Sequence, residues 1–240
     1  MRTFLFKDIR FVLIFSVVLL DIIGIGIIFP IIPDLLKDVG IAQNASAAFW
    51  GGLLSSSYAF MQFVFSPTLG AISDIFGRRP VLLTASLLLA LDYLVMGFAE
   101  TIFILFIGRI IGGLAGGTIS TATAYLADIS EAKDKKKNFA VIGAAFGLGF
   151  ILGPVIGGLI GEIDVRMPFF LSAFLCFLNF FLCLLLLPET LELTSKNNFQ
   201  IKKLNPFFNM SFVFKLPLLK GLFFCFFLIA FANTVYPAIW

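Results

Sequence analysis

The sequence alternates between long apolar stretches and short polar connections. A helix needs about 20 apolar residues to cross about 30 Å of hydrocarbon, where the backbone must satisfy its own hydrogen bonds. Stretches of this kind predict seven transmembrane helices: Phe11–Pro33, Phe49–Ser73, Pro80–Ala99, Thr101–Ala127, Phe139–Gly161, Met167–Pro188 and Gly221–Trp240. The first is too long for the apolar part of a signal peptide and lacks a cleavage pattern after it, so we expect it to remain as a helix.

One polar connection is much longer than the others. It runs from Glu189 to Lys220 and contains serine, several asparagines and two prolines, a composition typical of a linker between membrane units. The sequence therefore predicts a six-helix bundle at 1–188, a linker at 189–220 and a seventh helix at 221–240. Six helices followed by a lone seventh, which ends at Trp240 without a polar tail, are expected to be a truncated unit.

The basic residues predict an orientation. Fourteen lysines and arginines lie at the N-terminus, in the second–third and fourth–fifth connections and in the linker, whereas Lys37 and Arg166 alone lie on the other side. Because Lys and Arg in short loops remain on the cytoplasmic side, we expect a cytoplasmic N-terminus. The expected location is a bacterial inner (plasma) membrane that the chain crosses several times.

Composition narrows the possible functions. Apolar residues make up 60% of the 240 and charged residues 13%, against about 25% charged in soluble domains. The absence of histidine excludes a Ser-His-Asp triad and any histidine metal site. Cys176, Cys183 and Cys225 lie in apolar stretches without CxxC spacing, so neither a disulfide framework nor a zinc site is expected. No GxxxxGK[ST] phosphate loop occurs, so ATP-driven transport by this chain is not expected. Enzyme activity, a bound metal and a nucleic-acid partner are not expected either.

Within the predicted spans, Asp21, Asp92 and Arg109 are the acidic or basic residues. Asp21, Gln62 and Asp92 lie about 15–18 Å from the cytoplasmic edge of their helices, and Arg109 lies at a similar depth in the fourth. A charge in hydrocarbon needs a partner or a watery cavity, and transporter sites lie near the midplane. These four residues are therefore the candidate substrate site. The alternative is that each polar group only holds helices together.

The connection between the second and third spans is a second candidate region. It contains a set of small, acidic and basic residues: Gly70, Asp74, Gly77, Arg78, Arg79 and Pro80. Gly77 can take a positive φ in a tight turn, and Asp74 can pair with Arg78 or Arg79. A polar turn on the cytoplasmic side would explain the arginines, but not the whole GxxxDxxGRR pattern.

Glycines at a spacing of four mark two further helices. In the fourth span they surround Arg109, and in the fifth the set is Gly149, Gly153, Pro154, Gly157 and Gly158. Glycines four residues apart drift by only about 40° around a helix, so they form one stripe along which another helix can approach closely. Close packing alone accounts for these glycines.

These motifs together resemble those of the major facilitator superfamily. The GxxxDxxGRR set resembles its second–third loop signature, the stretch around Arg109 its proton-coupling motif, and GxxxGPxxGG its antiporter motif. Asp21 with its GIGIIFPIIP continuation, Asp92-Tyr93 and the YLAD sequence ending at Asp128 resemble the tetracycline/proton antiporters, over nearly the whole chain. The resemblance implies substrate or proton handling by Asp21, Gln62 and Asp92. It also implies a part in the conformational cycle for Asp74 and for the loop residues around it, which are Gly70, Gly77, Arg78, Arg79 and Asp128.

The expected function is proton-driven drug export by alternating access, with tetracycline as a magnesium chelate the favoured substrate. On this interpretation no cofactor is bound tightly, the proton gradient supplies the energy, and Mg²⁺ enters only with the drug. The partners are the lipid bilayer, the drug, protons, and the missing C-terminal half or a complementing chain. The alternatives are a general multidrug or metabolite carrier of the same superfamily, or an inactive truncated remnant.

Overall fold

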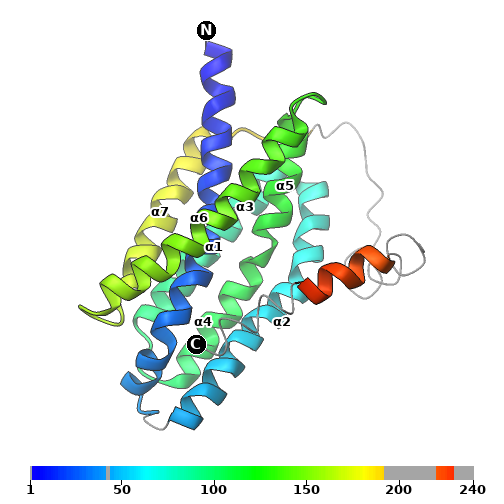
Figure 1. Cartoon of the computed structure of the whole chain (residues 1–240). Helices are drawn as coiled ribbons and strands as arrows, with labels where there is room; N and C mark the ends of the chain where they lie inside the picture. The colour runs from blue at the N-terminus through cyan, green and yellow to red at the C-terminus, as the bar shows by residue number, and fades with distance from the viewer. Residues whose placement is uncertain (1, 42–43, 192–219, 230–240) are drawn as a thin grey trace. The chain divides into compact units, whose positions relative to one another are not determined.

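The computed structural model describes residues 2–41, 44–191 and 220–229. The chain divides into two compact units, Met1–Phe199 and Gln200–Trp240. The first contains the helices α1 (Arg2–Asp38), α2 (Asn44–Phe76), α3 (Arg78–Gly97), α4 (Ile102–Leu114), the 3₁₀ turn η1 (Ala115–Gly117), α5 (Thr118–Ile129), α6 (Lys135–Gly161) and α7 (Met167–Leu186) (Figure 1). In the second unit the described part is the helix Lys220–Ile229.

Six stretches of helix in the described residues are long and apolar enough to cross a membrane. They correspond to the first six predicted spans, so the all-helical membrane class is confirmed. Of the predicted seventh span, Lys220–Ile229 is an apolar helix, and residues 230–240 lie outside the described part. Most of the predicted linker, residues 192–219, lies outside it too.

The helices differ from the predicted spans in two respects. We expected the first span to end at Pro33, but α1 continues to Asp38 with Pro30 and Pro33 inside it. A membrane helix tolerates proline where neighbouring helices compensate for the freed backbone group. The fourth predicted span corresponds to Ile102–Ile129, and within it the α-helix tightens into the 3₁₀ turn η1, since glycine favours the α-helix weakly and α2 packs directly against this turn.

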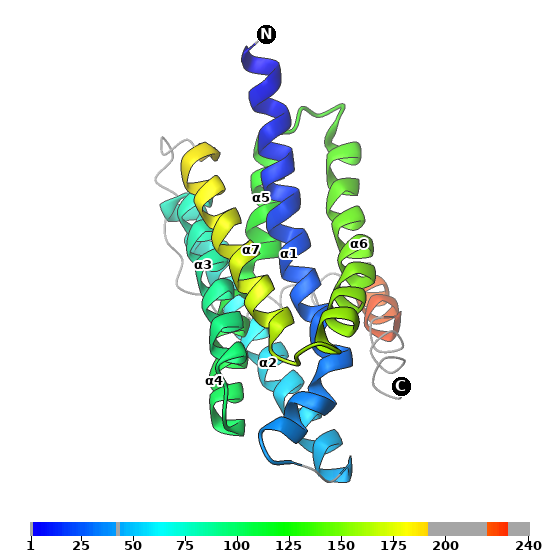
Figure 2. The same ribbon diagram turned by 90° about the vertical axis from the view of Figure 1, so that its left-hand side faces the viewer.

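Packing within the first unit places α1 and α3 in the interior. α1 packs along α6, α3 along α7, and α2 along α4 and η1, while α3 also contacts α4 (Figures 1 and 2). More than half of the residues in the apolar stretches of α1 and α3 are buried, whereas few of those in α2 and α6 are. Side chains on α1 and α3 are therefore the ones that the fold buries away from solvent and lipid.

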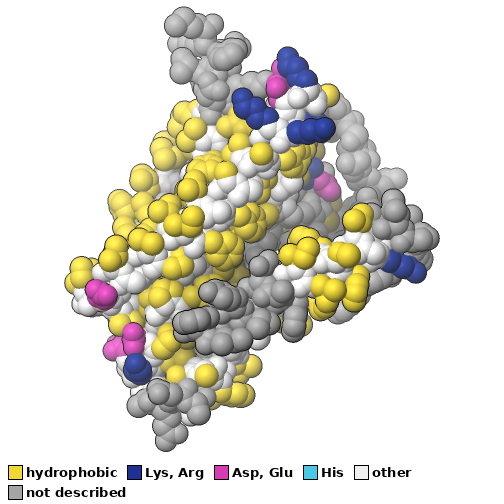
Figure 3. Space-filling view, viewed as in Figure 1, with side chains coloured by type: hydrophobic (Ala, Val, Ile, Leu, Met, Phe, Trp, Pro, Cys, Tyr) yellow, Lys and Arg dark blue, Asp and Glu magenta, His cyan; other side chains and the backbone are white. Residues whose placement is uncertain are grey.

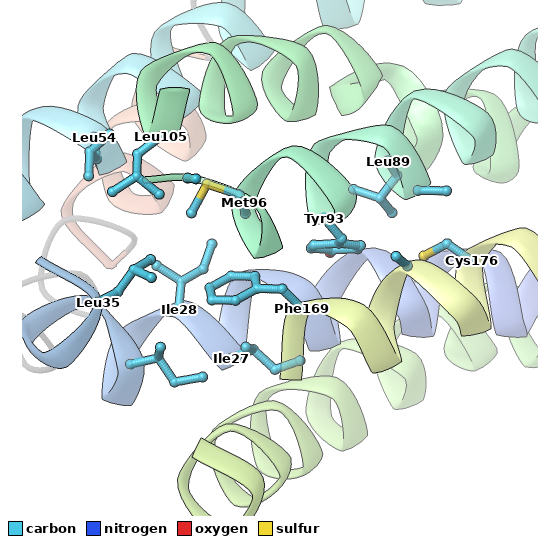
Figure 4. Close-up of a cluster of buried hydrophobic side chains, with 14 of the residues drawn as sticks. Ile27, Ile28, Leu35, Leu54, Leu89, Tyr93, Met96, Leu105, Phe169 and Cys176 are labelled. Carbon is cyan, nitrogen blue, oxygen red and sulfur yellow. The ribbon is translucent and has the colours of Figure 1, made fainter. Parts of the chain in front are cut away.

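The core consists of two clusters of buried side chains along α1. One surrounds Ile27, Tyr93, Met96, Phe169 and Cys176, where α1, α3 and α7 meet (Figure 4). The other contains α1 residues from Leu13 to Ile22 with Tyr125 and Leu187. Asp21 lies near the middle of α1 and Asp92 in the second half of α3, on the helices that bridge the two clusters.

The surface of the first unit is mostly apolar. Exposed phenylalanines, leucines and isoleucines line its helices, and charged side chains gather at the two ends (Figure 3). Exposure of this apolar area to water would have a large free-energy cost. This surface is therefore suited to contact with membrane lipid.

Candidate functional site

Asp92 and Arg109 form an ion pair inside the bundle. A terminal nitrogen of Arg109 lies 2.9 and 3.0 Å from the two carboxylate oxygens of Asp92, and the Asp92 and Arg109 side chains are 1% and 3% exposed. The guanidinium carbon also lies 5.4 Å from the ring centre of Tyr58 on α2, within the range of a cation–π contact. Side chains from two other helices, α3 and α2, thus compensate for this one buried positive charge of α4.

Glycines on α4 make room for this pair. A Cβ at Gly112 would overlap the Asp92 carboxylate, and one at Gly108 would lie 3.1 Å from it. Farther along, Gly113, Gly116 and η1 Gly117 face Met61, Gln62 and Leu69 of α2. The glycine motif around Arg109 is therefore a packing surface whose first two members also seat the acidic partner.

Asp21 differs from Asp92 in having no hydrogen-bond partner among the described residues. It is 1% exposed, and neither carboxylate oxygen accepts a hydrogen bond. It lies close enough to Asp92 for the two carboxyl groups to interact electrostatically, and Tyr58 interacts with both and with Arg109. One turn along α1, the Tyr93 hydroxyl group occupies the space above Gly24. The structure thus places Asp21 near Asp92, which pairs with Arg109.

Gln62 is the predicted site residue that makes no hydrogen bond with the two aspartates or Arg109 among the described residues. It is half-buried on α2 and packs against Gly116, and within the described residues its side chain makes no hydrogen bond. Tyr58, one helical turn earlier, occupies the place next to Arg109 instead. No pattern in the sequence pointed to a contact of Tyr58 with Arg109, although its spacing of four from Gln62 places both residues on one face of the helix.

A small cavity lies between α1, α3, α5 and α7. Val17 and Leu20 border it, together with the polar groups of Ser86, Thr118 and Asn179. The Ser16 hydroxyl group donates to the side-chain oxygen of Asn179 at 2.6 Å. The cavity has room for about one water molecule, so a hydrated polar group can lie within the bundle itself.

The turn between α2 and α3 has the predicted geometry. Gly77 has φ 106°, and Arg78 pairs with Asp74 through one terminal nitrogen and with Asp128 through Nε at 3.4 Å. The prediction that Asp74 pairs with an arginine is confirmed for Arg78. Arg79 instead donates to the Leu184 carbonyl oxygen of α7 at 2.6 Å. Gly70 faces Ser120 of α5.

Glu189 completes this turn, although no pattern in the sequence pointed to it. Its carboxylate accepts the backbone N–H groups of Arg78 at 2.9 Å and Arg79 at 3.1 Å, the first amides of α3. A carboxylate there satisfies helix-start donors and complements the helix dipole. A Cβ at Gly77 would overlap the Glu189 carboxylate, so glycine is required here by contact as well as by φ.

The glycines of α6 divide between two faces. Gly149, Gly153 and Gly157 are buried against α1, and a Cβ at Gly153 would lie 2.7 Å from Gly26 Cα and from the Ile23 carbonyl oxygen. Pro154 lies across from Gly26 in the same contact, whereas Gly158 has no neighbour within 4 Å of its Cβ position. The motif thus brings the α1 and α6 backbones into direct contact, with Gly158 outside this contact.

Gly153→Ala is therefore expected to destabilise the bundle by about 1–3 kcal/mol, because backbone atoms of α1 block the added methyl group. Gly143→Ala is the matched control: it lies on the same helix, and its Cβ would meet nothing within 4 Å. Thermal unfolding in detergent should show a lower midpoint for Gly153→Ala alone. Equal midpoints for both variants would contradict the α1–α6 contact.

Six membrane-length helices around a buried ion pair and an unpaired carboxyl group, all within the described residues, define a polytopic membrane protein of the transporter type. Residues 14–239 match the Major Facilitator Superfamily, and the chain belongs to this family. The resemblance predicted from the motifs is therefore confirmed.

Several curated proteins are similar to this chain. It is 37% identical over 229 residues to the tetracycline resistance protein, class C, of Escherichia coli, covering 95% of this chain and 57% of that protein. It is 41% identical over 174 residues to the class B protein of Escherichia coli, covering 72% and 43%. It is 33% identical over 197 residues to the quinolone resistance protein NorA of Staphylococcus aureus, covering 82% and 48%. The chain thus spans about half the length of the curated relatives it matches.

Solved structures agree with this assignment. The human organic anion transporter MFSD10 superposes with a TM-score of 0.68 at 29% identity, covering 78% of this chain and 49% of that one. The peptide transporter POT in complex with sulfate gives 0.65 at 14% identity, covering 78% and 40%. The second likeness shows the fold alone.

Proposed function

We propose that this chain is the N-terminal half of a proton-coupled drug exporter in which Asp21 exchanges the proton. The supporting observation is that Asp21 is buried beside the Asp92–Arg109 pair with both carboxylate oxygens unpartnered among the described residues. A carboxyl group with two free oxygens can take up a proton or accept a hydrogen bond from a substrate without breaking an existing bond. Asp92 lacks this freedom, because Arg109 occupies both of its oxygens.

Tetracycline, carried as its magnesium chelate, is the substrate that we propose first. Several of the similar proteins are named tetracycline resistance proteins. Mg²⁺ would enter as part of the substrate, and the proton gradient would supply the energy. The likeness to a protein named for quinolone resistance supports a second candidate, a multidrug exporter with the same proton site.

Coexpression with the missing helices tests this proposal. A drug-sensitive bacterial host would produce this chain together with the C-terminal half of the class C relative, with each half alone as control. We expect tetracycline export that stops when a protonophore collapses the proton gradient. Export of a fluoroquinolone at a similar rate would favour the multidrug alternative. No export of either drug, with both halves present in the membrane, would contradict the proposal.

The proposed orientation places the Gly77 end of the bundle in the cytoplasm. Cysteines introduced at Lys133, which is exposed at that end, and at Ile163, which is exposed at the other, would report it in a cysteine-free background. An impermeant thiol reagent added outside intact cells should label the Ile163 position and spare the Lys133 position. The reverse pattern would invert the orientation of every helix.

Asp74 is proposed to act in the conformational cycle rather than in folding. Its side chain is 50% exposed, and Arg78 keeps Asp128 as a second anionic partner. An exposed ion pair is typically worth about 0–1 kcal/mol. In the coexpressed transporter, Asp74→Asn should therefore abolish most transport while the amount of folded protein stays unchanged. Loss of the folded protein would instead indicate a structural role.

A further inference from the structure

Arg10 is a half-buried cation that forms no ion pair with a carboxylate in the described part of the chain. It lies on α1, one turn before Leu13 and Ile14 of the core. Among the described residues it forms no ion pair and no side-chain hydrogen bond, and its Nε is shielded from solvent without an acceptor. A charged N–H group removed from water is unfavourable until an acceptor reaches it. An acceptor from outside these residues would therefore be stabilising here.

Arg79 is a second cation with unused donors. One terminal nitrogen donates to the Leu184 carbonyl oxygen, but its Nε, also shielded from solvent, has no acceptor among the described residues. The neighbouring anion is Glu189, whose carboxylate accepts backbone N–H groups, those of Arg78, Arg79, Thr190 and Leu191. Within the described residues, no carboxylate pairs with the Arg79 guanidinium group.

Both cations lie around the end of α7. Each interacts electrostatically with Tyr125, as does the Glu189 carboxylate, and the Tyr125 hydroxyl group donates to the Pro188 carbonyl oxygen at 2.9 Å. Arg10 comes from α1 and Arg79 from α3, and both of these helices pack against α7 (Figure 2). The two guanidinium groups are therefore gathered at one place on the rim of the bundle.

Apolar surface continues from this place along α7. Phe181, Leu184 and Leu185 are exposed on its last turns, Leu185 by 78%. Because Arg79 is hydrogen-bonded to the Leu184 backbone, its guanidinium group lies at the head of this apolar strip. Arginine characteristically runs its stem along apolar surface and holds its charge at the membrane boundary.

We propose that Arg10 and Arg79 bind the phosphate of an anionic phospholipid such as phosphatidylglycerol. The planar guanidinium group matches phosphate oxygens, and basic pockets between transmembrane helices are known to take anionic headgroups. The acyl chains would cover Phe181, Leu184 and Leu185. A free phosphate ion would satisfy the same nitrogens but leave that strip uncovered, so the apolar surface favours the lipid.

Lipid retention by the purified chain tests this site. The 240-residue protein would be reconstituted with equal parts of phosphatidylglycerol and phosphatidylcholine and extracted, and the retained lipids counted by native mass spectrometry. We expect preferential retention of phosphatidylglycerol, reduced about fivefold in Arg10→Gln or Arg79→Gln. Arg10→Lys keeps the charge and should retain most of the preference. Lys133→Gln makes the same charge change at an exposed cation that pairs with Glu131, and should change nothing.

Three outcomes would overturn the proposal: no preference in the wild type, the same preference in both glutamine variants, or an equal loss in Lys133→Gln. Inorganic phosphate that displaces phosphatidylglycerol as effectively as added phosphatidylglycerol would identify a soluble-anion site and overturn it too. Size-exclusion profiles would show that each variant is folded. Should Arg10→Gln aggregate, Arg10→Met, which keeps the apolar stem, gives the same comparison.

Discussion

An Asp92→Asn variant of this chain is expected to lose about 3–5 kcal/mol of folding free energy, because Arg109 would remain buried without its counter-charge. The two side chains are 1% and 3% exposed, and Asp92 is the carboxylate that the structure places on the guanidinium group. The remaining contact, with Tyr58, is a cation–π interaction worth about 2 kcal/mol when desolvated. Thermal unfolding in detergent, followed by size-exclusion chromatography, would measure the loss.

Removal of both charges provides the control. In Asp92→Asn/Arg109→Met the unpaired cation is gone, so most of the lost stability should return. Recovery would show that the penalty comes from the orphaned charge rather than from a changed shape at position 92. A double variant as unstable as the single one would contradict the ion-pair interpretation.

An Asp21→Asn variant is expected to behave in the opposite way. Asp21 is equally buried, but no donor among the described residues contacts its carboxylate oxygens, so the substitution breaks no hydrogen bond there. An uncharged amide also costs less to place in hydrocarbon than an ionised carboxylate. The variant should therefore fold at least as well as the wild type and yet abolish proton-driven tetracycline uptake into everted vesicles when the second half is coexpressed.

The same chemical change thus separates the roles of two aspartates. Asp92→Asn should fail in folding, and Asp21→Asn in transport alone. Asp21→Glu, which retains a titratable carboxyl group, should keep part of the uptake. Normal proton-driven uptake by Asp21→Asn would remove this residue from the mechanism.

The positions of the helices and the depth of the charged residues were accessible from sequence, because both follow from length and hydropathy along one helix. Asp21, Asp92 and Arg109 could be placed near one depth by counting residues from the ends of their spans. Which aspartate pairs with Arg109 could not be predicted, since that depends on how α1, α3 and α4 rotate about their axes. The α4 glycines decide it, because Gly108 and Gly112 leave room for Asp92.

Contacts between distant segments were the part that sequence could not supply. Glu189 follows the last predicted span of the bundle, yet its carboxylate caps α3, 110 and 111 residues away. Gln62 and Tyr58 lie on one face of α2, and only the packing of α4 shows that Tyr58 meets Arg109. The interruption of the fourth span at η1 likewise depends on the fit of α2 against Gly116 and Gly117.

Proton movement on drug addition tests the central claim most directly. Everted vesicles containing this chain with the second half would be energised until their lumen is acidic, with the pH difference followed by a fluorescent weak base. If Asp21 exchanges the proton, tetracycline should release luminal protons in wild-type vesicles and should not do so with Asp21→Asn at equal protein level. Equal tetracycline-dependent proton release from both would contradict the assignment of the proton site to Asp21.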